Sequence, residues 1–294
     1  MEKKLLMIVN PRAGRNKSHG PLFDAAAIFS EAGYLLRIHR TTAPGDATET
    51  VAREGSQYDL VVASGGDGTL NETIAGLVQL DNPPLLGYLP QGSTNDFASS
   101  LHISDDPAAA AEVIVQEHVQ VLDVGLWNQR PFAYVASFGA FTRTSYTASQ
   151  ASKNALGHFA YILEGMKDLN SLRPYRIRVT ADGEVLDGDY LFGAVCNSTS
   201  IGGLMKLDPE RVVLDDGKFE LLLIPSPKTP LELQNLMLAL LNQHYDSEGL
   251  VFRHISSLHL ETEEDLPWSL DGEYAPSTPS VDIVNRQGAL RILL

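Results

Sequence analysis

The residue types best suited to chemistry stand together in one glycine-rich segment, Ser64-Gly65-Gly66-Asp67-Gly68-Thr69-Leu70-Asn71-Glu72. Glycines let backbone amides approach an anion closely, and a helix that begins within the segment would direct its positive end toward that anion. Phosphate would repel the Asp67 carboxylate unless a cation such as Mg²⁺ lay between them. The segment therefore favours a phosphate-binding loop with a metal ion, and an ordinary strand-to-helix turn is the alternative.

Other nucleotide-binding signatures are incomplete or missing. The segment lacks the third glycine of the dinucleotide fingerprint, and the chain has no G-x-x-x-x-G-K-[ST] sequence. There is also no H-E-x-x-H pattern for catalytic zinc and no G-x-S-x-G pattern for a serine nucleophile.

Further segments carry residues that fit phosphate transfer. Residues 10–14 and 92–96 contain glycine, and each segment follows an apolar run. Asp271-Gly272-Glu273-Tyr274 supplies two carboxylates near the C-terminus, although a hairpin turn with solvated acids would have the same sequence. Residues 213–218 include Asp215-Asp216-Gly217, which is typical of a tight turn.

The elements that would position these segments alternate between apolar strand-like runs and helical patterns. We expect strands at 5–9, 34–39, 59–63, 85–89 and 119–124, and helices at 21–33, 48–54, 70–80 and 107–117. This alternation predicts a parallel sheet with helices on both faces. Because ligands bind beyond the carboxyl ends of such strands, segments 10–14, 65–69 and 92–96 should converge at one edge of the sheet.

The pattern changes near residue 125. Strand-like runs at 132–138, 176–180, 190–196, 219–224, 258–261, 281–284 and 290–294 are separated by turn residues, and two helices are expected at 154–169 and 229–244. Tight turns are predicted at 182–183 and 187–188. The fold class is therefore an α/β domain over 1–125 followed by a largely antiparallel, β-rich domain over 126–294. The last residues could return to the first domain.

Composition excludes several classes of protein. The 294 residues carry a net charge of −15, which argues against broad nucleic-acid binding because that binding depends on neutralising phosphates. A single cysteine rules out an intrachain disulfide and a Cys₄ zinc site, and it fits a reducing cytoplasm. No apolar run reaches the length of a membrane-spanning helix, so contact with a membrane should be peripheral.

Four motifs together resemble a known family: Asn10-Pro11-Arg12-Ala13-Gly14, the GGDGTLNE segment, Gly92-Ser93-Thr94-Asn95-Asp96-Phe97-Ala98 and Asp271-Gly272-Glu273. In this order and spacing they are similar to the diacylglycerol kinase catalytic domain family, within a superfamily shared with sphingosine kinases and NAD kinases. The resemblance covers nearly the whole chain. It implies an NAD kinase-like fold and an ATP site formed by Asn10, Pro11, Arg12, Ala13, Gly14, Thr41, Gly65, Gly66, Asp67, Gly68, Thr69, Leu70, Asn71 and Thr94.

Two positions in that ATP site differ from the family or stay open. Arg12 replaces the small residue common in the family and adds a positive charge beside the phosphates. Thr42 is the alternative to Thr41.

The resemblance also assigns catalytic and metal-binding roles. Glu273 matches the family's proposed general base, and Asp271 and Asp67 are the other catalytic acids, with Asp271 binding Mg²⁺ or orienting the base through water. A second Mg²⁺, remote from the transferred phosphate, would be held by Asp216 and the carbonyls of Val213 and Lys218, and Asp215 is the alternative carboxylate. Asp96 and Asp123 would link metal sites through water or act as cap and strand-end residues.

The function implied is Mg²⁺- and ATP-dependent phosphorylation of the diacylglycerol hydroxyl by a cytoplasmic, peripherally membrane-associated kinase. Arg15 and Lys17 would form a basic rim, and Tyr146, His158 and Tyr161 would border a lipid cleft or fill the core. A homodimer is expected from the resemblance alone. The alternatives are another lipid acceptor, such as phosphatidylglycerol or a sphingoid base, an NAD kinase, and a nucleotide-binding regulator without catalysis.

Overall fold

The computed structural model describes residues 2–13, 20–92, 95–139, 173–201, 205–207, 211–242, 244–245 and 249–294. The chain divides into two compact units. Unit 1 comprises Met1–Val124 and Gln287–Leu294, and unit 2 comprises Gly125–Arg286. The helix expected at 154–169 lies outside the described residues. No helix within the described ranges is long and apolar enough to cross a membrane.

Unit 1 is built around a parallel sheet. Its strands are β1 (Lys3–Val9), β2 (Tyr34–Arg40), β3 (Leu60–Gly65) and β4 (Leu85–Pro90), together with the end of β17 (Ser280–Leu293) and the start of β5 (Val119–Trp127). The order is β2-β1-β3-β4, and β17 joins parallel to β4 through Ile292 and Leu86. The predicted parallel α/β architecture is therefore confirmed.

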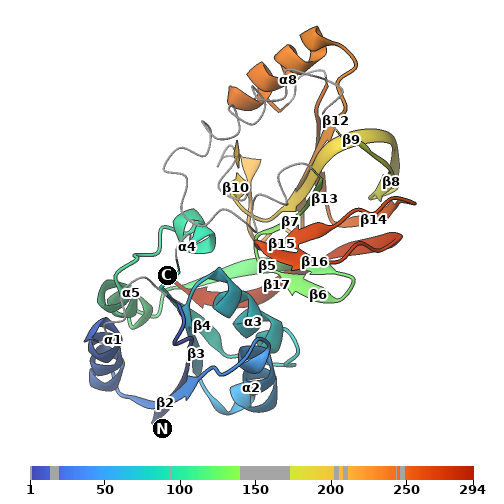
Figure 1. Ribbon diagram of the computed structural model, residues 1–294. Helices are drawn as coiled ribbons and strands as arrows, with labels where there is room; N and C mark the ends of the chain where they lie inside the picture. The colour runs from blue at the N-terminus through green and yellow to red at the C-terminus, as the bar shows by residue number, and fades with distance from the viewer. Residues whose placement is uncertain are drawn as a thin grey trace. The chain divides into compact units, whose positions relative to one another are not determined.

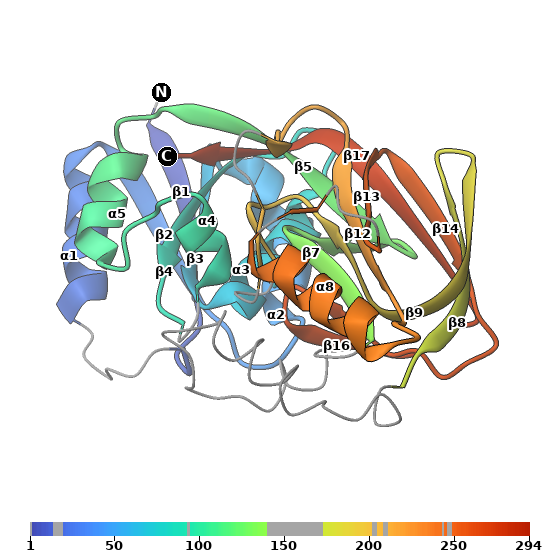
Figure 2. The ribbon, with the colours of Figure 1, turned by 90° about the horizontal axis from the view of Figure 1, so that it is seen from above.

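Helices cover both faces of this sheet because its central strands are apolar on both sides. All six residues of β3 are buried. One face carries α1 (Gly20–Glu31) and α5 (Pro107–Ile114), which pack on each other, and the opposite face carries α2 (Asp46–Glu54) and α3 (Asp67–Leu77) (Figures 1 and 2). Two short elements, the 3₁₀ turn η1 (Gly55–Gln57) and α4 (Asp96–Ser100), complete the unit.

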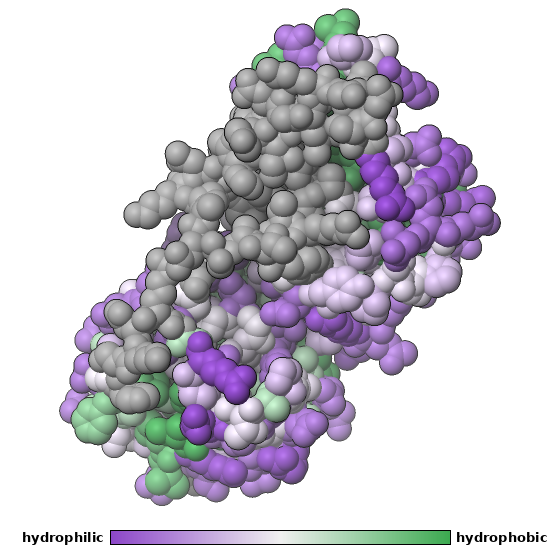
Figure 3. All heavy atoms as spheres, viewed as in Figure 1, coloured by the Kyte–Doolittle hydropathy of each residue, from purple (hydrophilic) through white to green (hydrophobic). Residues whose placement is uncertain are grey.

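The outer edge of the sheet keeps some apolar side chains in contact with solvent. Phe23 on α1 and Leu35 and Ile38 on β2 are exposed, and Figure 3 shows apolar surface over this part of unit 1. Buried residues from β1, β3, α1 and α5 form the core beneath, among them Leu5, Phe29, Leu60, Val62 and Ala111.

Unit 2 is largely antiparallel. Its strands are the end of β5, β6 (Arg130–Phe132), β7 (Val135–Gly139), β8 (Tyr175–Ala181), β9 (Glu184–Cys196), β10 (Ser200–Ile201), β11 (Met205–Lys206), β12 (Phe219–Pro225), β13 (Val251–Ile255), β14 (Ser257–Glu261), β15 (Trp268–Leu270), β16 (Glu273–Ala275) and the start of β17. The order is β16-β15-β7-β9-β8-β14-β17, and β12 pairs with both β9 and β13. One helix, α8 (Pro230–Leu241), follows β12. Trp268, wholly buried, packs on Phe138 with ring centroids 4.8 Å apart.

Three local predictions after residue 125 were wrong. The runs at 281–284 and 290–294, expected to be separated by turn residues, belong to one continuous strand, β17. The single strand expected at 132–138 is divided into β6 and β7, because the chain bends at Ala133 and Tyr134 to aim backbone amides at a carboxylate. The turn expected at 187–188 lies inside β9, where Gly188 pairs with Ile177 of β8. The turn at Asp182-Gly183, with φ of 44° and 91°, already reverses the chain, so the strand continues through the second Asp-Gly pair.

Candidate active site

Close packing of backbone explains the glycines of the central segment. A Cβ on Gly65 would lie 2.4 Å from Thr69 Oγ1, and one on Gly92 would lie 2.7 Å from the Cα of Gly66. The loops after β3 and β4 therefore touch backbone to backbone at Gly66 and Gly92, which leaves no ordinary space there for a side chain. Gly66 is the N-cap of α3, and Asp67 begins that helix. Helix N-termini of this kind favour anions, because their first amides lack partners within the helix.

Asn10 joins the loop after β1 to the glycine-rich segment. Its backbone amide donates to Ser64 O at 3.0 Å, and its side-chain amide nitrogen donates to Thr69 Oγ1 at 3.0 Å. Its side-chain oxygen accepts the amide of Arg12 at 2.9 Å, and its backbone oxygen accepts the amide of Ala13 at 3.2 Å. This turn, which includes Pro11, is fixed by asparagine because that side chain offers both a donor and an acceptor. Arg12 itself is exposed.

The loop after β4 is tied to the same place. The Gln91 amide donates to Gly65 O at 2.7 Å, and its side chain donates to Ser64 Oγ at 2.8 Å. Three loops that are distant in sequence are thus hydrogen-bonded to one another at the carboxyl edge of the sheet. Gln91 was missed by the sequence reasoning, since a single glutamine after a strand carries no signal of its own.

Asp67 and Asp96 form a half-buried acidic pair beside these loops. Asp67 Oδ2 accepts the amide of Asp96 at the start of α4 at 3.2 Å. Its other oxygen, Oδ1, is buried and has no hydrogen-bond partner within the described part of the chain. Burial raises the pKa of Asp67, and backbone hydrogen bonds oppose that rise. Burial, and then the charge of Asp67, raises the pKa of Asp96 to about 6.

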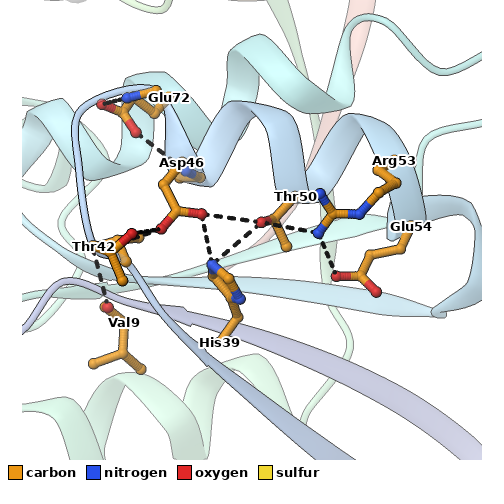
Figure 4. A network of polar contacts seen from close by, with 11 residues as sticks. Val9, His39, Thr42, Asp46, Thr50, Arg53, Glu54 and Glu72 are labelled. Atoms are coloured by element: carbon orange, nitrogen blue, oxygen red, sulfur yellow. Dashed lines mark hydrogen bonds and ion pairs between the residues drawn. The ribbon is translucent and has the colours of Figure 1, made fainter.

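The two threonines after β2 have different partners. Thr42 Oγ1 donates to Asp46 Oδ2 at 2.8 Å, and the Thr42 amide donates to the same oxygen at 2.7 Å (Figure 4). Thr41 donates its amide to Val9 O at 2.9 Å, and its hydroxyl lies 3.4 Å from that oxygen. Thr42 therefore closes a turn with Asp46, whereas the Thr41 hydroxyl makes only a long contact next to Asn10.

The Asp271-Gly272 pair is a tight turn between β15 and β16, with φ of 49° and 84°. Asp271, only 3% exposed, is not a solvated acid. Its Oδ2 accepts the amide of Ala133 at 2.6 Å, and its Oδ1 accepts the amides of Tyr134 at 3.0 Å and Val135 at 2.9 Å. Glu273 stands on the next strand with an exposed side chain. The two predicted acids of unit 2 thus occupy opposite environments.

The predicted metal segment is a surface turn. Asp216 Oδ1 accepts the amide of Lys218 at 2.9 Å, across Gly217 with φ of 79°. Val213 and Asp215 are also exposed. Within the described ranges, no three His, Cys, Asp or Glu residues are grouped as a metal site. The predicted site has only one carboxylate, that of Asp216, and its other ligands are the backbone carbonyls of Val213 and Lys218. The absence of such a side-chain group therefore does not test it.

Glu220 is a buried acid that the sequence reasoning missed. It is 2% exposed and lies on β12 between Cys196 of β9 and His254 of β13. Its Oε2 has no hydrogen-bond partner within the described residues, and Oε1 is 3.5 Å from His254 Nδ1. Burial raises the pKa of Glu220 to about 8.

The remaining predicted residues fall into two groups. Leu70 is buried in α3, and Gly68 and Asn71 are partly buried in its first turns. Asp123 is buried on β5 and accepts the amide of Gly288 at 2.8 Å, so it holds two strands together. The predictions for Gly14, Arg15, Lys17, Ser93, Thr94, Tyr146, His158 and Tyr161 lie outside the described residues.

Comparison with known proteins shows what class of protein these features define. Residues 4–127 match the diacylglycerol kinase catalytic domain, and residues 135–294 match the YegS C-terminal NAD kinase beta sandwich-like domain. A diacylglycerol kinase of Bacillus subtilis (strain 168) is 33% identical over 99% of this chain and 96% of its own length. A diacylglycerol kinase of Staphylococcus aureus (strain MRSA252) is 33% identical over 95% and 89%.

Solved structures agree with the sequence relatives. The crystal structure of a diacylglycerol kinase from Bacillus anthracis str. Sterne superimposes with a TM-score of 0.76 at 25% identity, covering 99% of this chain and 96% of that one. A second structure from the same organism gives a TM-score of 0.79 at 28% identity, with coverage of 99% and 97%. The chain belongs to the diacylglycerol kinase family of lipid kinases, as the four motifs predicted.

The acidic pair fits the divalent cation expected of such a kinase. Asp67 Oδ1 is a buried carboxylate oxygen without a hydrogen-bond partner in the described residues, and Asp96 supplies a second carboxylate whose pKa is raised. Oxygen donors of this kind suit Mg²⁺, and a bound cation would offset the repulsion between the two acids.

Proposed function

We propose that this protein phosphorylates the hydroxyl of diacylglycerol, using ATP and Mg²⁺ and giving phosphatidic acid. The observation that carries the proposal is the hydrogen-bonded assembly of three loops at the edge of the parallel sheet. Asn10, Thr69 and Gln91 fix those loops in contact, and the N-terminus of α3 opens from the same place. The names of the relatives support diacylglycerol as the acceptor.

The roles of the residues follow from their chemistry. The backbone amides at the start of α3 would bind phosphate, while Asn10 and Gly66 keep the loops close enough to present them. The Thr41 hydroxyl, and not that of Thr42, would contact ATP, because Thr42 is already bound to Asp46. Asp67 and Asp96 would hold Mg²⁺, which neutralises phosphate charge when bound.

Glu273 would accept the proton of the lipid hydroxyl. Its exposed carboxylate stands beside a turn that Asp271 fixes through three backbone amides, so Asp271 positions the hairpin that carries the base. In the turn at residues 213–218, Asp216 with the carbonyls of Val213 and Lys218 would hold a second Mg²⁺. The lipid substrate implies work at a membrane surface.

Transfer of labelled γ-phosphate from ATP to diacylglycerol in mixed micelles with Mg²⁺ tests the proposal. Wild type should give labelled phosphatidic acid, whereas Glu273→Gln should lose at least about a hundredfold in kcat because general bases contribute that much. Glu263→Gln is the matched control, since Glu263 is an exposed acid of the same unit. Full activity of Glu273→Gln would disprove the assignment of the base.

A panel of acceptors separates the proposed function from its neighbours. Diacylglycerol, phosphatidylglycerol, a sphingoid base and NAD are offered in turn with the same labelled ATP. Labelled NAD without any labelled lipid would replace the proposal with an NAD kinase activity. ATP binding without transfer to any acceptor would identify a regulator that has kept only the nucleotide site.

A further inference from the structure

Glu72, the last residue of the glycine-rich segment, reaches out of its own helix to the loop after β2. Its Oε1 accepts the amide of Gly45 at 2.8 Å, and its Oε2 accepts the amide of Ala47 at 3.3 Å. Its backbone oxygen accepts the hydroxyl of Thr48 at 2.8 Å. These three contacts join α3, which begins with Asp67, to the start of α2 (Figure 4).

The start of α2 has no cap of its own. Its N-cap residue is Gly45, which has φ of 86° and no side chain to accept the free amides of the first turn. The Glu72 carboxylate takes this place from another helix, where the positive end of α2 favours a negative charge. The two helices are held close enough for this because α3 carries Gly76, where a Cβ would lie 2.6 Å from Val51 Cβ.

A second carboxylate fixes the same loop from its other end. Asp46 Oδ2 accepts both the amide and the hydroxyl of Thr42, and Asp46 Oδ1 lies 2.8 Å from His39 Nε2 (Figure 4). The loop from Thr41 to Gly45 is therefore held by two carboxylates: Asp46 binds Thr42 near its start, and Glu72 binds Gly45 at its end. Its first residue, Thr41, donates its amide to Val9 O, directly before Asn10.

We propose that Glu72 is a positioning residue for ATP: by capping α2 it holds the Thr41–Gly45 loop in the conformation that presents Thr41 to the nucleotide. This inference rests on the proposed ATP site and adds a residue to it. Without the cap, the loop would visit other conformations, and ATP would bind only to the fraction of molecules in the competent one. The apparent affinity falls by that fraction, whereas the chemical step at saturating ATP is unchanged.

The test compares Glu72→Gln and Glu72→Ala with Glu49→Gln in the full-length protein. Glutamine keeps one acceptor oxygen for Gly45 and loses the charge, and alanine removes both acceptors. Glu49 is an exposed acid in the first turn of α2, so its substitution makes the same charge change near the same helix end without touching the loop. Thr48→Val, which removes only the hydroxyl contact to the Glu72 carbonyl, is a fourth variant if alanine does not fold.

ATP dissociation constants are measured with Mg²⁺ and no lipid, followed by KM for ATP, KM for diacylglycerol and kcat. We expect Glu72→Ala to weaken ATP binding and raise KM for ATP about tenfold, as for a competent fraction of about one tenth. Glu72→Gln should show a smaller rise. KM for the lipid and kcat at saturating ATP should stay within about twofold of wild type, and Glu49→Gln should match wild type throughout. A merely structural role would lower stability without this split between the two KM values.

The outcomes separate the two proposals. Unchanged ATP binding in folded Glu72→Ala and Glu72→Gln, with wild type binding normally, overturns the role of Glu72 and leaves the kinase proposal standing. A loss of kcat with no change in KM for ATP also overturns it. Wild-type protein that does not bind ATP at all overturns the proposed function, and the role of Glu72 falls with it.

Discussion

Replacing Asp271 by asparagine tests whether this acid holds the hairpin that carries Glu273. The substitution preserves size and the left-handed backbone, since asparagine tolerates φ near 49° as well as aspartate does. The substitution removes the negative charge and replaces one acceptor oxygen of the side chain by an NH₂ donor. In the folded protein the carboxylate accepts the amides of Ala133, Tyr134 and Val135 at 2.6–3.0 Å in a site only 3% exposed.

The cost follows from how an amide can replace that carboxylate. With the side-chain oxygen facing Tyr134 and Val135, the amide nitrogen faces the Ala133 amide, so two donors meet. One charge-assisted hydrogen bond is lost, at about 1.5–3 kcal/mol, and the other two weaken. The opposite orientation loses two bonds. We therefore expect Asp271→Asn to lower the free energy of unfolding by about 2–4 kcal/mol, which is about 4–16 °C in the melting temperature for a unit of this size.

Urea unfolding at pH 7 measures this change, and phosphate transfer measured at 25 °C shows whether Glu273 moves with the hairpin. Asp265→Asn is the control, because Asp265 is an exposed acid in the segment before β15 and should change stability by less than about 0.5 kcal/mol. If Asp271→Asn unfolds within that same margin of wild type, the three amide contacts do not determine the conformation of the bend and the reasoning fails.

Three smaller predictions concern other contacts. Gly92→Ala should raise KM for ATP several-fold in steady-state assays and lower the free energy of unfolding by about 1–3 kcal/mol, because its Cβ would lie 2.7 Å from the Cα of Gly66. Unchanged kinetics would contradict this packing. Hydrogen bonds from Thr42 and His39 lower the pKa of Asp46 from 3.8 to about 2, so its stabilisation is present above about pH 4 and is lost as the pH falls toward 2. Urea titrations should therefore show a flatter acid limb for Asp46→Asn. Arg253→Ala should cost less than about 1 kcal/mol despite its bidentate pair with Glu184, because that pair is exposed, and a loss above about 2 kcal/mol would contradict this.

The fold class could be predicted from the sequence because its signals are local. Each strand of the parallel sheet is a short apolar run, such as Leu60–Gly65, followed by a helical pattern, and that alternation allows few architectures. The antiparallel character of unit 2 followed equally from short strands between turn residues. Where a local signal was ambiguous, the prediction failed. Asp187-Gly188 has the same composition as the turn at Asp182-Gly183, and only pairing with β8 shows that it is strand.

The site was harder to predict wherever a residue acts through distant partners. Glu72 reads as an ordinary helical acid until the structure places it at the start of α2. In the sequence, Glu220 is a polar residue between apolar ones, which predicts a side chain facing solvent. Both faces of β12 are buried, however, so Glu220 is buried as well. Asp271 was predicted to bind Mg²⁺ or to orient the base through water. Its observed partners are backbone amides from a bend more than 130 residues earlier. None of these contacts leaves a mark in the sequence around the residue.

Asp67 is half-buried and Asp271 is buried, and the structure predicts opposite results for the same substitution. Every oxygen of Asp271 accepts backbone amides, so its charge serves the fold. Asp67 has one oxygen on the Asp96 amide and one buried without a partner in the described residues, next to a second acid. Leaving a polar atom unpaired costs about 1–3 kcal/mol, and folding alone gives no reason to bear that cost.

Asp67→Asn should therefore leave the free energy of unfolding unchanged or raise it by about 1–2 kcal/mol, because removing the repulsion with Asp96 offsets the weaker bond to the Asp96 amide. Phosphate transfer should fall at least a hundredfold in the same variant, since the carboxylate fits a cation at the phosphates. Urea unfolding and labelled-phosphate transfer on one preparation measure both. A variant that is clearly destabilised and still active would mean that Asp67, like Asp271, is retained for the fold and that the cation site lies elsewhere.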